Sequence, residues 1–298
     1  MTDFGGALKP LEEHPEYRLA VLGVPFDEKS SYLRGAAGGP RAIREASTGK
    51  CYNPQTELGV DLDRETVLVD LGDVDTSGDV DKTFSLIEKN VAAILDKNAV
   101  PIVLGGDHSI TYPVVKAFSR SRAPLDILHF DAHPDLYEDL YGDRLSHACP
   151  FARIMEGGLA KRLVQIGIRT LTQHQREQAA RYGVEAIEMK DWHEGRKMSF
   201  SGPVYISFDV DALDPAFAPG VSHREPGGFS TRQVVSVIQS FKGSVVGADI
   251  VEFNPRRDVK GMTDMVCAKI LKEMAARMSR NRSRLAEPRP EEDREGAL

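Results

Sequence analysis

Two carboxylates and one imidazole stand at alternate positions in one short segment: Asp131, His133 and Asp135. The apolar run 125–130 before them is typical of a buried strand. Side chains two residues apart point to the same side of an extended chain, and Pro134 lets the chain bend beyond the strand. We therefore expect the three side chains to face one point. Carboxylate oxygens mixed with an imidazole suit Mn, Fe, Co, Ni or Zn better than Ca or Mg. The simpler alternative is a loop whose polar residues only cap a strand.

Three more candidate ligands follow two other predicted strands. His108 comes after the apolar run 100–104, and Asp209 and Asp211 come after the run 204–208. Four carboxylates and two imidazoles exceed what one ion normally takes, but they suit two divalent ions about 3.5–4 Å apart if some carboxylates bridge. Four aspartates also balance the four positive charges. Because metal binding lowers the pKa of water to about 7 in the well-studied zinc case, this set predicts a site that makes hydroxide near neutral pH.

The elements that must position these side chains alternate between strands and helices. Patterning predicts strands over 18–25, 66–71, 100–104, 125–130, 163–168, 185–189, 204–208 and 244–251, and helices from 40 onward and over 80–97, 110–118, 152–155, 172–182, 231–241 and 262–278. Such alternation indicates one mainly parallel sheet with helices on both faces. Sheets of this kind bind ligands beyond the carboxyl ends of their strands, where every candidate ligand lies. With no repeat and no linker, we expect one domain over 17–279, an N-terminal arm over 1–16 and a charged, flexible tail over 280–298.

Composition narrows the class of protein. The 298 residues are 41% hydrophobic and 28% charged, which is ordinary for a soluble globular protein. With 38 basic and 45 acidic residues the net charge is -7, which argues against a nucleic-acid partner. No apolar run has spanning length and the first residues do not resemble a signal peptide, so we expect a cytoplasmic enzyme without a membrane partner. Three widely spaced cysteines, Cys51, Cys149 and Cys267, favour a reducing compartment.

Four motifs surround the candidate ligands: Gly-Gly-Asp-His-Ser from residue 105, Asp-Ala-His-Pro-Asp from 131, Ser-His-Ala from 146, and Ser-Phe-Asp-Val-Asp-Ala-Leu-Asp-Pro from 207. Together they resemble those of the ureohydrolases, the family of arginase, agmatinase and other guanidino-group hydrolases. The resemblance extends over residues 18–278. It implies a three-layer α/β/α fold, two Mn²⁺ ions with Ni²⁺ as an alternative, and hydrolysis of a guanidino substrate to urea and an amine. It also implies a homo-oligomer, a trimer or a hexamer.

The resemblance also assigns roles to single residues. It makes the six candidates metal ligands, with Asp135 counted among the catalytic residues as well. His147 matches the family's proton-shuttling histidine, and Glu252 matches the carboxylate that holds the guanidinium. The chemistry agrees, because a departing amine needs a proton from a group that titrates near neutrality and a planar cation calls for a bidentate carboxylate. Taken alone, His147 reads equally as a helix-entry residue and Glu252 as a salt-bridge partner.

The motifs are most similar to those of plant-type arginases and their bacterial, agmatinase-like relatives. The loop after residue 135 departs from animal arginases, which carry Asn and Ser there for the amino-acid head group. Here Arg144 can meet a substrate carboxylate, which favours arginine. Agmatine comes next, with an ammonium for Glu138 or Asp143. Tyr137 and His223 are further candidate substrate-binding residues, His223 at the entrance and Tyr137 either in the core or at the rim. Free guanidine or a short alkyl or acid guanidine is the third choice, since an aromatic loop can shorten the pocket.

A different class of function also stays open at this point. The chain can be a catalytically silent, ureohydrolase-like subunit that is retained for assembly. Deacetylases that share the fold keep one zinc and lose part of the second ligand set, whereas all six positions are filled here. The complete ligand set, together with His147 and Glu252, argues for an active enzyme.

Overall fold

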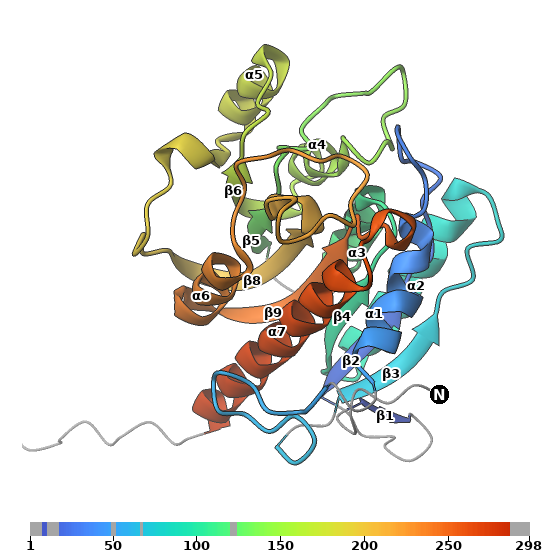
Figure 1. The fold of residues 1–298 in the computed structure, drawn as a ribbon. Coiled ribbons are helices and arrows are strands. Elements are labelled where there is room, and N and C mark those ends of the chain that lie inside the picture. The colour runs from blue at the N-terminus through green and yellow to red at the C-terminus, as the bar shows by residue number, and fades with distance from the viewer. Residues whose placement is uncertain (1–7, 11–17, 49–51, 66–67, 120–123, 287–298) are drawn as a thin grey trace, which may run out of the picture.

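A single nine-stranded sheet runs through the part of the chain that the structure, a computed structural model, describes: residues 8–10, 18–48, 52–65, 68–119 and 124–286. The strand order is β1-β3-β2-β4-β9-β8-β5-β6-β7, and all neighbours are parallel (Figure 1). The strands are β1 (Leu8–Pro10), β2 (Leu19–Gly23), β3 (Leu68–Asp73), β4 (Val100–Leu104), β5 (Leu125–Phe130), β6 (Ala160–Ile168), β7 (Glu185–Glu188), β8 (Ser199–Asp209) and β9 (Lys242–Val251). The parallel sheet that the sequence predicts is confirmed.

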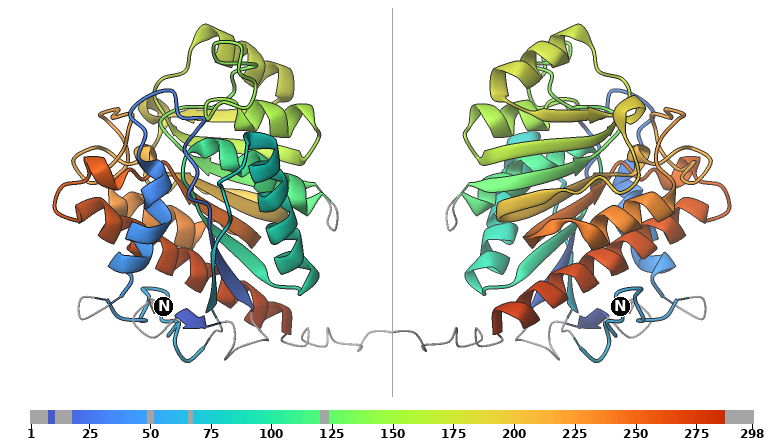
Figure 2. Two further views of the ribbon diagram at one scale, coloured as in Figure 1. Left: turned by 90° about the vertical axis from the view of Figure 1, so that its right-hand side faces the viewer. Right: turned by 90° about the vertical axis from the view of Figure 1, so that its left-hand side faces the viewer.

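Helices cover both faces of this sheet, as the two side views in Figure 2 show. Helices α1, α6 and α7 pack together on one face, and α2, α3 and α4 pack on the other, with α5 against α4. The helices are α1 (Gly39–Ala46), α2 (Val80–Asp96), α3 (Thr111–Phe118), α4 (Pro150–Glu156), α5 (Gln173–Tyr182), α6 (Thr231–Ser240) and α7 (Met262–Ala286). The three-layer α/β/α architecture is therefore confirmed as well.

Each central strand contributes to two hydrophobic cores, one on either side of the sheet. In β2, Leu19 and Val21 belong to the core under α1 and α7, while Ala20 and Leu22 belong to the core under α2 and α3. Successive side chains of a strand point to opposite faces, so a sheet covered on both faces needs uninterrupted apolar strands. This is why the central strands read as continuous apolar runs in the sequence.

Local signals set several helix ends. The Asp79 carboxylate accepts a hydrogen bond from the Lys82 backbone N–H and caps α2. Capping boxes begin α5, with Thr172 and Gln175, and α6. These caps satisfy free backbone N–H groups and fix the residue at which each helix begins.

Two boundaries differ from the sequence prediction. Helix α7 continues past Met278 to Ala286, so the predicted helix end and the tail from 280 were placed too early. The added turns are mostly Arg, Leu and Ala, which are good helix formers, and basic side chains suit a helix C-terminus. Strand β1 lies within the segment predicted as an arm, and residues 287–298 of the predicted tail lie outside the described residues.

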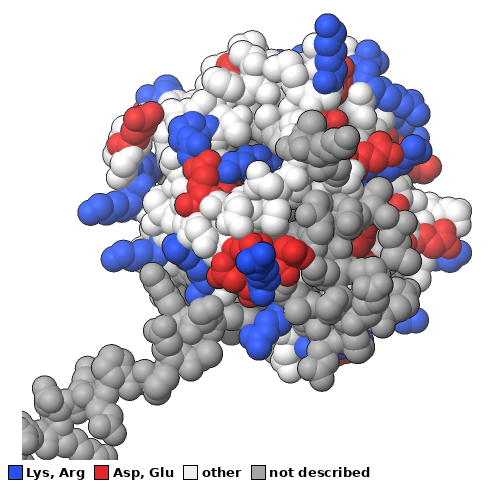
Figure 3. Space-filling model, turned by 60° about the horizontal axis from the view of Figure 1, so that its bottom comes forward, with Lys and Arg blue, Asp and Glu red and all other residues white. Residues whose placement is uncertain are grey.

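The sequence predicts neither a nucleic-acid partner nor a membrane partner, and two features of the structure concern that prediction. On the face shown in Figure 3, basic and acidic side chains are interspersed. In the described part of the chain, no helix combines the length and the apolar character that crossing a bilayer requires.

Candidate active site

The candidate residues gather at the carboxyl ends of four neighbouring strands at the centre of the sheet, β4, β9, β8 and β5. His108 follows β4 in a short 3₁₀ turn, Glu252 follows β9, Asp209 ends β8, and Asp131 follows β5. Because the carboxyl ends of parallel strands meet at one edge, residues more than 140 positions apart in the chain, such as His108 and Glu252, become neighbours. Their backbone and side chain are linked directly: the His108 N–H donates to Glu252 Oε1 over 2.9 Å.

Three carboxylates surround one ring nitrogen of His108. Its Nδ1 lies 3.2 Å from Asp131 Oδ2, 3.1 Å from Asp135 Oδ2 and 3.2 Å from Asp209 Oδ2. All four residues are buried, and this nitrogen has no hydrogen-bond partner among the described residues. Asp135 has a φ of 48°, a left-handed conformation that is costly for a residue with a side chain and is typical of functional sites. Three oxygens and one free nitrogen that converge in this way could hold one of the two ions that the sequence predicts.

The second half of the site shares a carboxylate with the first. Asp131 Oδ1 faces His133 Nδ1 at 3.4 Å, and that nitrogen lies 3.0 Å from Asp211 Oδ2. Asp131, His133 and Asp211 offer atoms close enough together to hold one ion. Asp131 thus turns one oxygen toward each group, as a bridging carboxylate does in a two-metal site. The residues present fit two divalent cations of the Mn or Ni type.

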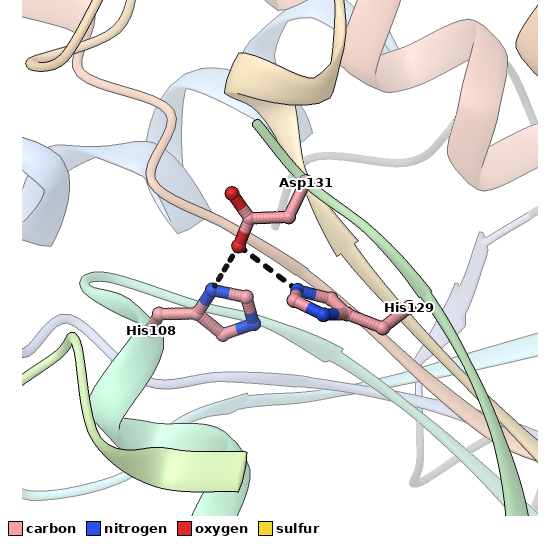
Figure 4. A group of neighbouring side chains, drawn as sticks. All are labelled: His108, His129 and Asp131. Carbon is pink, nitrogen blue, oxygen red and sulfur yellow. Dashed lines mark hydrogen bonds and ion pairs between the residues drawn. The ribbon is translucent and has the colours of Figure 1, made fainter. Parts of the chain in front are cut away.

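His129 also touches Asp131, but its bonding makes it a supporting residue rather than a ligand. Its Nε2 lies 2.9 Å from Asp131 Oδ2, and Figure 4 shows His108 and His129 both directed at this carboxylate. The other nitrogen of His129, Nδ1, is 3.0 Å from Gln165 Nε2, a donor that also bonds the Pro134 carbonyl. Nδ1 is therefore the acceptor, and Nε2 carries the proton that it donates to Asp131.

The charges in this site are crowded. Burial raises the pKa of Asp209 well above its usual range, and the charges of Asp211 and Asp131 add to the effect. Burial acts in the same direction on Asp131, but the surrounding histidines, among them His129 with its hydrogen bond and charge, outweigh it and hold its pKa well below the usual range. Carboxylates buried this closely are stable as anions only beside compensating cations.

The buried carboxylate of Asp249, which the sequence analysis missed, orients His108 through Ser207. Ser207 Oγ lies 3.0 Å from His108 Nε2 and donates its own proton to Asp249 Oδ1 over 2.7 Å. Tyr205 and Thr111 donate to the other oxygen, Oδ2, at 2.7 and 2.8 Å. Because Ser207 donates to Asp249, its oxygen accepts from Nε2–H, which leaves the lone pair of His108 on Nδ1. An aspartate inside the apolar strand β9 was the available signal in the sequence.

His147 and Glu252, to which the sequence analysis gives separate catalytic roles, lie in direct contact. His147 Nδ1 lies 3.0 Å from Glu252 Oε1, and both side chains are buried. Burial lowers the pKa of His147, but the hydrogen bond and charge of Glu252 outweigh it and raise the pKa to about 9. Burial likewise raises the pKa of Glu252, and the bond to His147 brings it below the usual value. Glu252 has a φ of 62°, a second left-handed residue at the site.

These residues open into one cavity of about 290 Å³. Its floor is formed by metal-ligand candidates and Glu252, and its wall by His147, His223 and Ser31. The rings of His223 and His147 stack with centroids 5.4 Å apart. Tyr137 and His223, two of the substrate-binding residues that the sequence predicts, both line the cavity.

Asp143 and Arg144, two predicted substrate-binding residues, are not brought to this cavity. Arg144 donates to both oxygens of Glu156, at 3.0 and 2.7 Å, and Asp143 pairs with Lys29 at 2.8 Å. Neither of the two lines the cavity. The prediction that Arg144 meets a substrate carboxylate is therefore not supported, because the side chain already has a bidentate partner.

The mouth of the cavity is built instead by residues that the sequence analysis did not single out. Thr172 and Gln175 of the α5 capping box line it, and the box uses the Gln175 carbonyl oxygen, so that the Nε2 donor remains for a ligand. Glu225, in the loop before α6, lines the same cavity, and its carbonyl accepts from Arg169, which also bonds the carbonyl of Asp211. No basic side chain of the described residues pairs with the Glu225 carboxylate. The mouth thus presents one free carboxylate and neutral donors.

Comparison with known proteins places this geometry among related enzymes. The chain matches the Arginase family over residues 17–276. It is 49% identical over 278 residues to "Arginase 1, mitochondrial" of Arabidopsis thaliana, an alignment that covers 88% of this chain and 81% of that protein. Among solved structures, the arginase from Medicago truncatula is similar with a TM-score of 0.84 and 45% identity, over 88% of each chain. The agmatine ureohydrolase of Thermoplasma volcanium is similar with a TM-score of 0.82 and 31% identity, over 96% of this chain and 97% of that one.

Proposed function

The chain belongs to the arginase family, and on this premise we propose that it hydrolyses the guanidino group of arginine to urea and an amine with two divalent metal ions. One observation carries the proposal. Four candidate metal ligands, His133, Asp135, Asp209 and Asp211, line one cavity together with the His147–Glu252 pair, and the other two, His108 and Asp131, contact these ligands from beneath. A silent assembly subunit would have no need to keep this constellation complete.

The ligand sets would hold the ions on either side of Asp131. His108, Asp135 and Asp209 supply donors on one side, and His133 and Asp211 on the other. Bound there, Mn²⁺ or Ni²⁺ would supply positive charge that polarises the substrate and lowers the pKa of water.

Glu252 is suited to hold the guanidinium. Its carboxylate is buried at the floor of the cavity, and its lowered pKa keeps it ionised at neutral pH. A carboxylate oxygen pair matches the parallel N–H groups of a planar guanidinium, which fixes the orientation of the carbon to be attacked.

His147 is suited to supply the proton that the departing amine needs. With a pKa of about 9 it is an imidazolium at neutral pH, and it lies in the cavity wall beside Glu252. Donation leaves a neutral imidazole, which the Glu252 carboxylate continues to orient through Nδ1.

The mouth of the cavity supports arginine first and agmatine second. The Glu225 carboxylate suits an ammonium, which both substrates carry, while the Gln175 Nε2 donor suits the carboxylate that only arginine carries. The plant relatives described as arginases share 44–49% of residues with this chain, against 35% for an agmatinase of Gallus gallus and 25% for the arginase from Bacillus subtilis.

The test is urea release by protein reconstituted separately with Mn²⁺ and with Ni²⁺. Arginine, agmatine, guanidinobutyrate and free guanidine are offered in parallel at equal metal loading. We expect arginine to give the highest kcat/KM. Another guanidine well ahead would revise the substrate alone, whereas no urea from any of them at full metal loading would contradict the proposed function.

A further inference from the structure

A serine in the loop between β2 and α1 completes the surroundings of His147. Ser31 Oγ lies 2.8 Å from His147 Nε2, while Glu252 holds the opposite nitrogen, Nδ1, at 3.0 Å. Ser31 also lines the cavity. Ser31 and His147 thus border the same space, which the substrate would occupy, and are in contact with each other there. From this geometry we propose that Ser31 positions His147 and relays its proton to the departing amine. The inference rests on the proposed function.

The loop that carries Ser31 is fixed to the site by bonds on both sides of the serine. The Lys29 N–H donates to Asp107, which precedes the ligand His108, over 2.8 Å, and the Lys29 carbonyl accepts from the His147 N–H over 3.3 Å. The backbone of Lys29 thus ties the loop both to Asp107, the residue before His108, and to His147. Although Ser31 is itself exposed, these backbone bonds hold the loop where its hydroxyl makes the short contact with His147.

The far side of the loop is anchored as well. The Leu33 carbonyl accepts from Asn254 Nδ2 at 2.7 Å and from Ser222 Oγ at 2.9 Å. The ring of Tyr32 packs on His223 with centroids 5.6 Å apart, and His223 in turn stacks on His147. The loop is therefore anchored on both sides of Ser31, at Lys29 before it and at Tyr32 and Leu33 after it.

The two hydrogen bonds of His147 give the proton a direction. Glu252 is an acceptor, so Nδ1 keeps its proton, and the mobile proton of the imidazolium is the one on Nε2. In the relay, Nε2–H passes its proton to Ser31 Oγ while the Ser31 O–H proton passes to the departing nitrogen. The carbon–nitrogen bond breaks as that nitrogen is protonated. The products are a neutral imidazole, an unchanged serine hydroxyl and a neutral amine leaving group, so protons and charge balance.

The neighbouring residue offers a matched control. Ser30 lies in the same loop, and its buried hydroxyl has no hydrogen-bond partner among the described residues. Ser31→Ala and Ser30→Ala therefore remove the same atom from adjacent positions, but only one of the two removes a contact with His147. Ser31→Thr keeps a hydroxyl and serves as the rescue variant.

The experiment compares metal-loaded wild type with the three variants, after metal content has been confirmed as equal. For Ser31→Ala we expect kcat to fall about tenfold, the usual effect of losing one hydrogen bond to a charged group, with KM changed less than about twofold. Ser31→Thr should recover most of the loss, and Ser30→Ala should keep the wild-type kcat. In mixtures of H₂O and D₂O, kcat of the wild type should follow a bowed curve, for two protons in motion, and kcat of Ser31→Ala a straight line.

Several results would overturn the inference. They are an unchanged kcat in Ser31→Ala, an equal loss in Ser30→Ala, or equally bowed curves in wild type and Ser31→Ala. The proposed function fails separately, if metal-loaded wild type releases no urea. In that case ¹⁵N NMR of the histidine side chains still decides the contact: the inference requires the His147 Nε2 resonance to move in Ser31→Ala and to stay in place in Ser30→Ala.

Discussion

Asp249→Asn should weaken metal binding although Asp249 is not a ligand. The substitution keeps the shape of the side chain and replaces one oxygen by an NH₂ group. Tyr205 and Thr111 both donate to Oδ2, so the remaining amide oxygen must take that place. The NH₂ group then faces Ser207, which in the native protein donates its proton to Oδ1. The serine oxygen accepts from the amide and turns its own proton toward His108.

The substitution would affect metal binding by changing which ring nitrogen of His108 carries the proton. When Ser207 donates to Nε2, the ring proton moves to Nδ1, the nitrogen that lies 3.1–3.2 Å from three carboxylate oxygens. That nitrogen can then no longer bind a cation without losing its proton. Loss of a supporting partner of a histidine ligand typically costs 10- to 100-fold in metal affinity, about 1.4–2.8 kcal/mol. One hydrogen bond to a charged group, about 1.5–3 kcal/mol, gives the same range.

The assay is competition for Mn²⁺ between the protein and a fluorescent chelator. Thr111→Val is the matched control, because it removes one donor to Asp249 and leaves the bond to Ser207 in place. We expect Asp249→Asn to weaken binding at the tighter site by 10- to 100-fold, and Thr111→Val to change it by less than about threefold. Equal affinities in wild type and Asp249→Asn would refute the argument from the tautomer.

Three further results are expected. Glu225→Gln should raise the KM for arginine and for agmatine about tenfold and leave kcat/KM for free guanidine unchanged. Arg144→Ala should leave the KM for arginine within about twofold. The reverse pattern would restore Arg144 as the substrate-binding residue. Hydrogen bonds from Arg232 and Lys269 lower the pKa of Glu57 to about 2. Because the pKa is lowered in the folded state, the contribution of Glu57 to stability is complete above about pH 4.5 and is lost as the pH falls toward 2. Glu57→Gln should lower the free energy of unfolding at pH 7 by less than about 1 kcal/mol, since the pair is largely exposed. A difference from wild type that persists at pH 2 in urea denaturation would contradict this. Removing metal with EDTA should lower Tm by about 5–10 °C, since ligand at a hundred times its Kd stabilises by about 2.7 kcal/mol; an unchanged Tm in differential scanning calorimetry would argue against metals at the site.

The metal-ligand candidates were predictable because each lies directly after a strand that the sequence makes recognisable. Asp131 follows an apolar run, and Asp209 ends another, so the rule that ligands bind at the carboxyl edge of a parallel sheet was enough to bring them together. Their types then indicated the chemistry. The fold was predictable from a different pattern, the alternation of strands and helices along nearly the whole chain.

The mouth of the cavity was not predictable in this way, because it depends on which partner each charged side chain selects. Arg144 was assigned to the substrate from its place in a loop beside the site, but Glu156 on α4 takes its guanidinium. Nothing in the sequence distinguishes that outcome from a free arginine. Gln175 and Glu225 come together only through the packing of α5 and the loop before α6 against the sheet.

Ser31 and Asp249 were missed for a related reason. Both act on a histidine that is far away in the sequence, 116 residues in the case of Ser31 and His147. Such contacts follow from strand order and from the path of one loop, and these are tertiary properties. A polar residue inside an apolar strand, as Asp249 is in β9, is a sequence signal of this kind.

The central claim is that two ions held around Asp131 carry the reaction, and a metal titration of activity tests it most directly. Metal-free protein is titrated with Mn²⁺ while bound metal and urea release from arginine are measured on the same samples. We expect urea release to rise until two equivalents per chain are bound and then to level off, and Asp131→Ala to lose tight metal binding and urea release together. Full activity at one equivalent or without bound metal, or an active Asp131→Ala, would contradict the account.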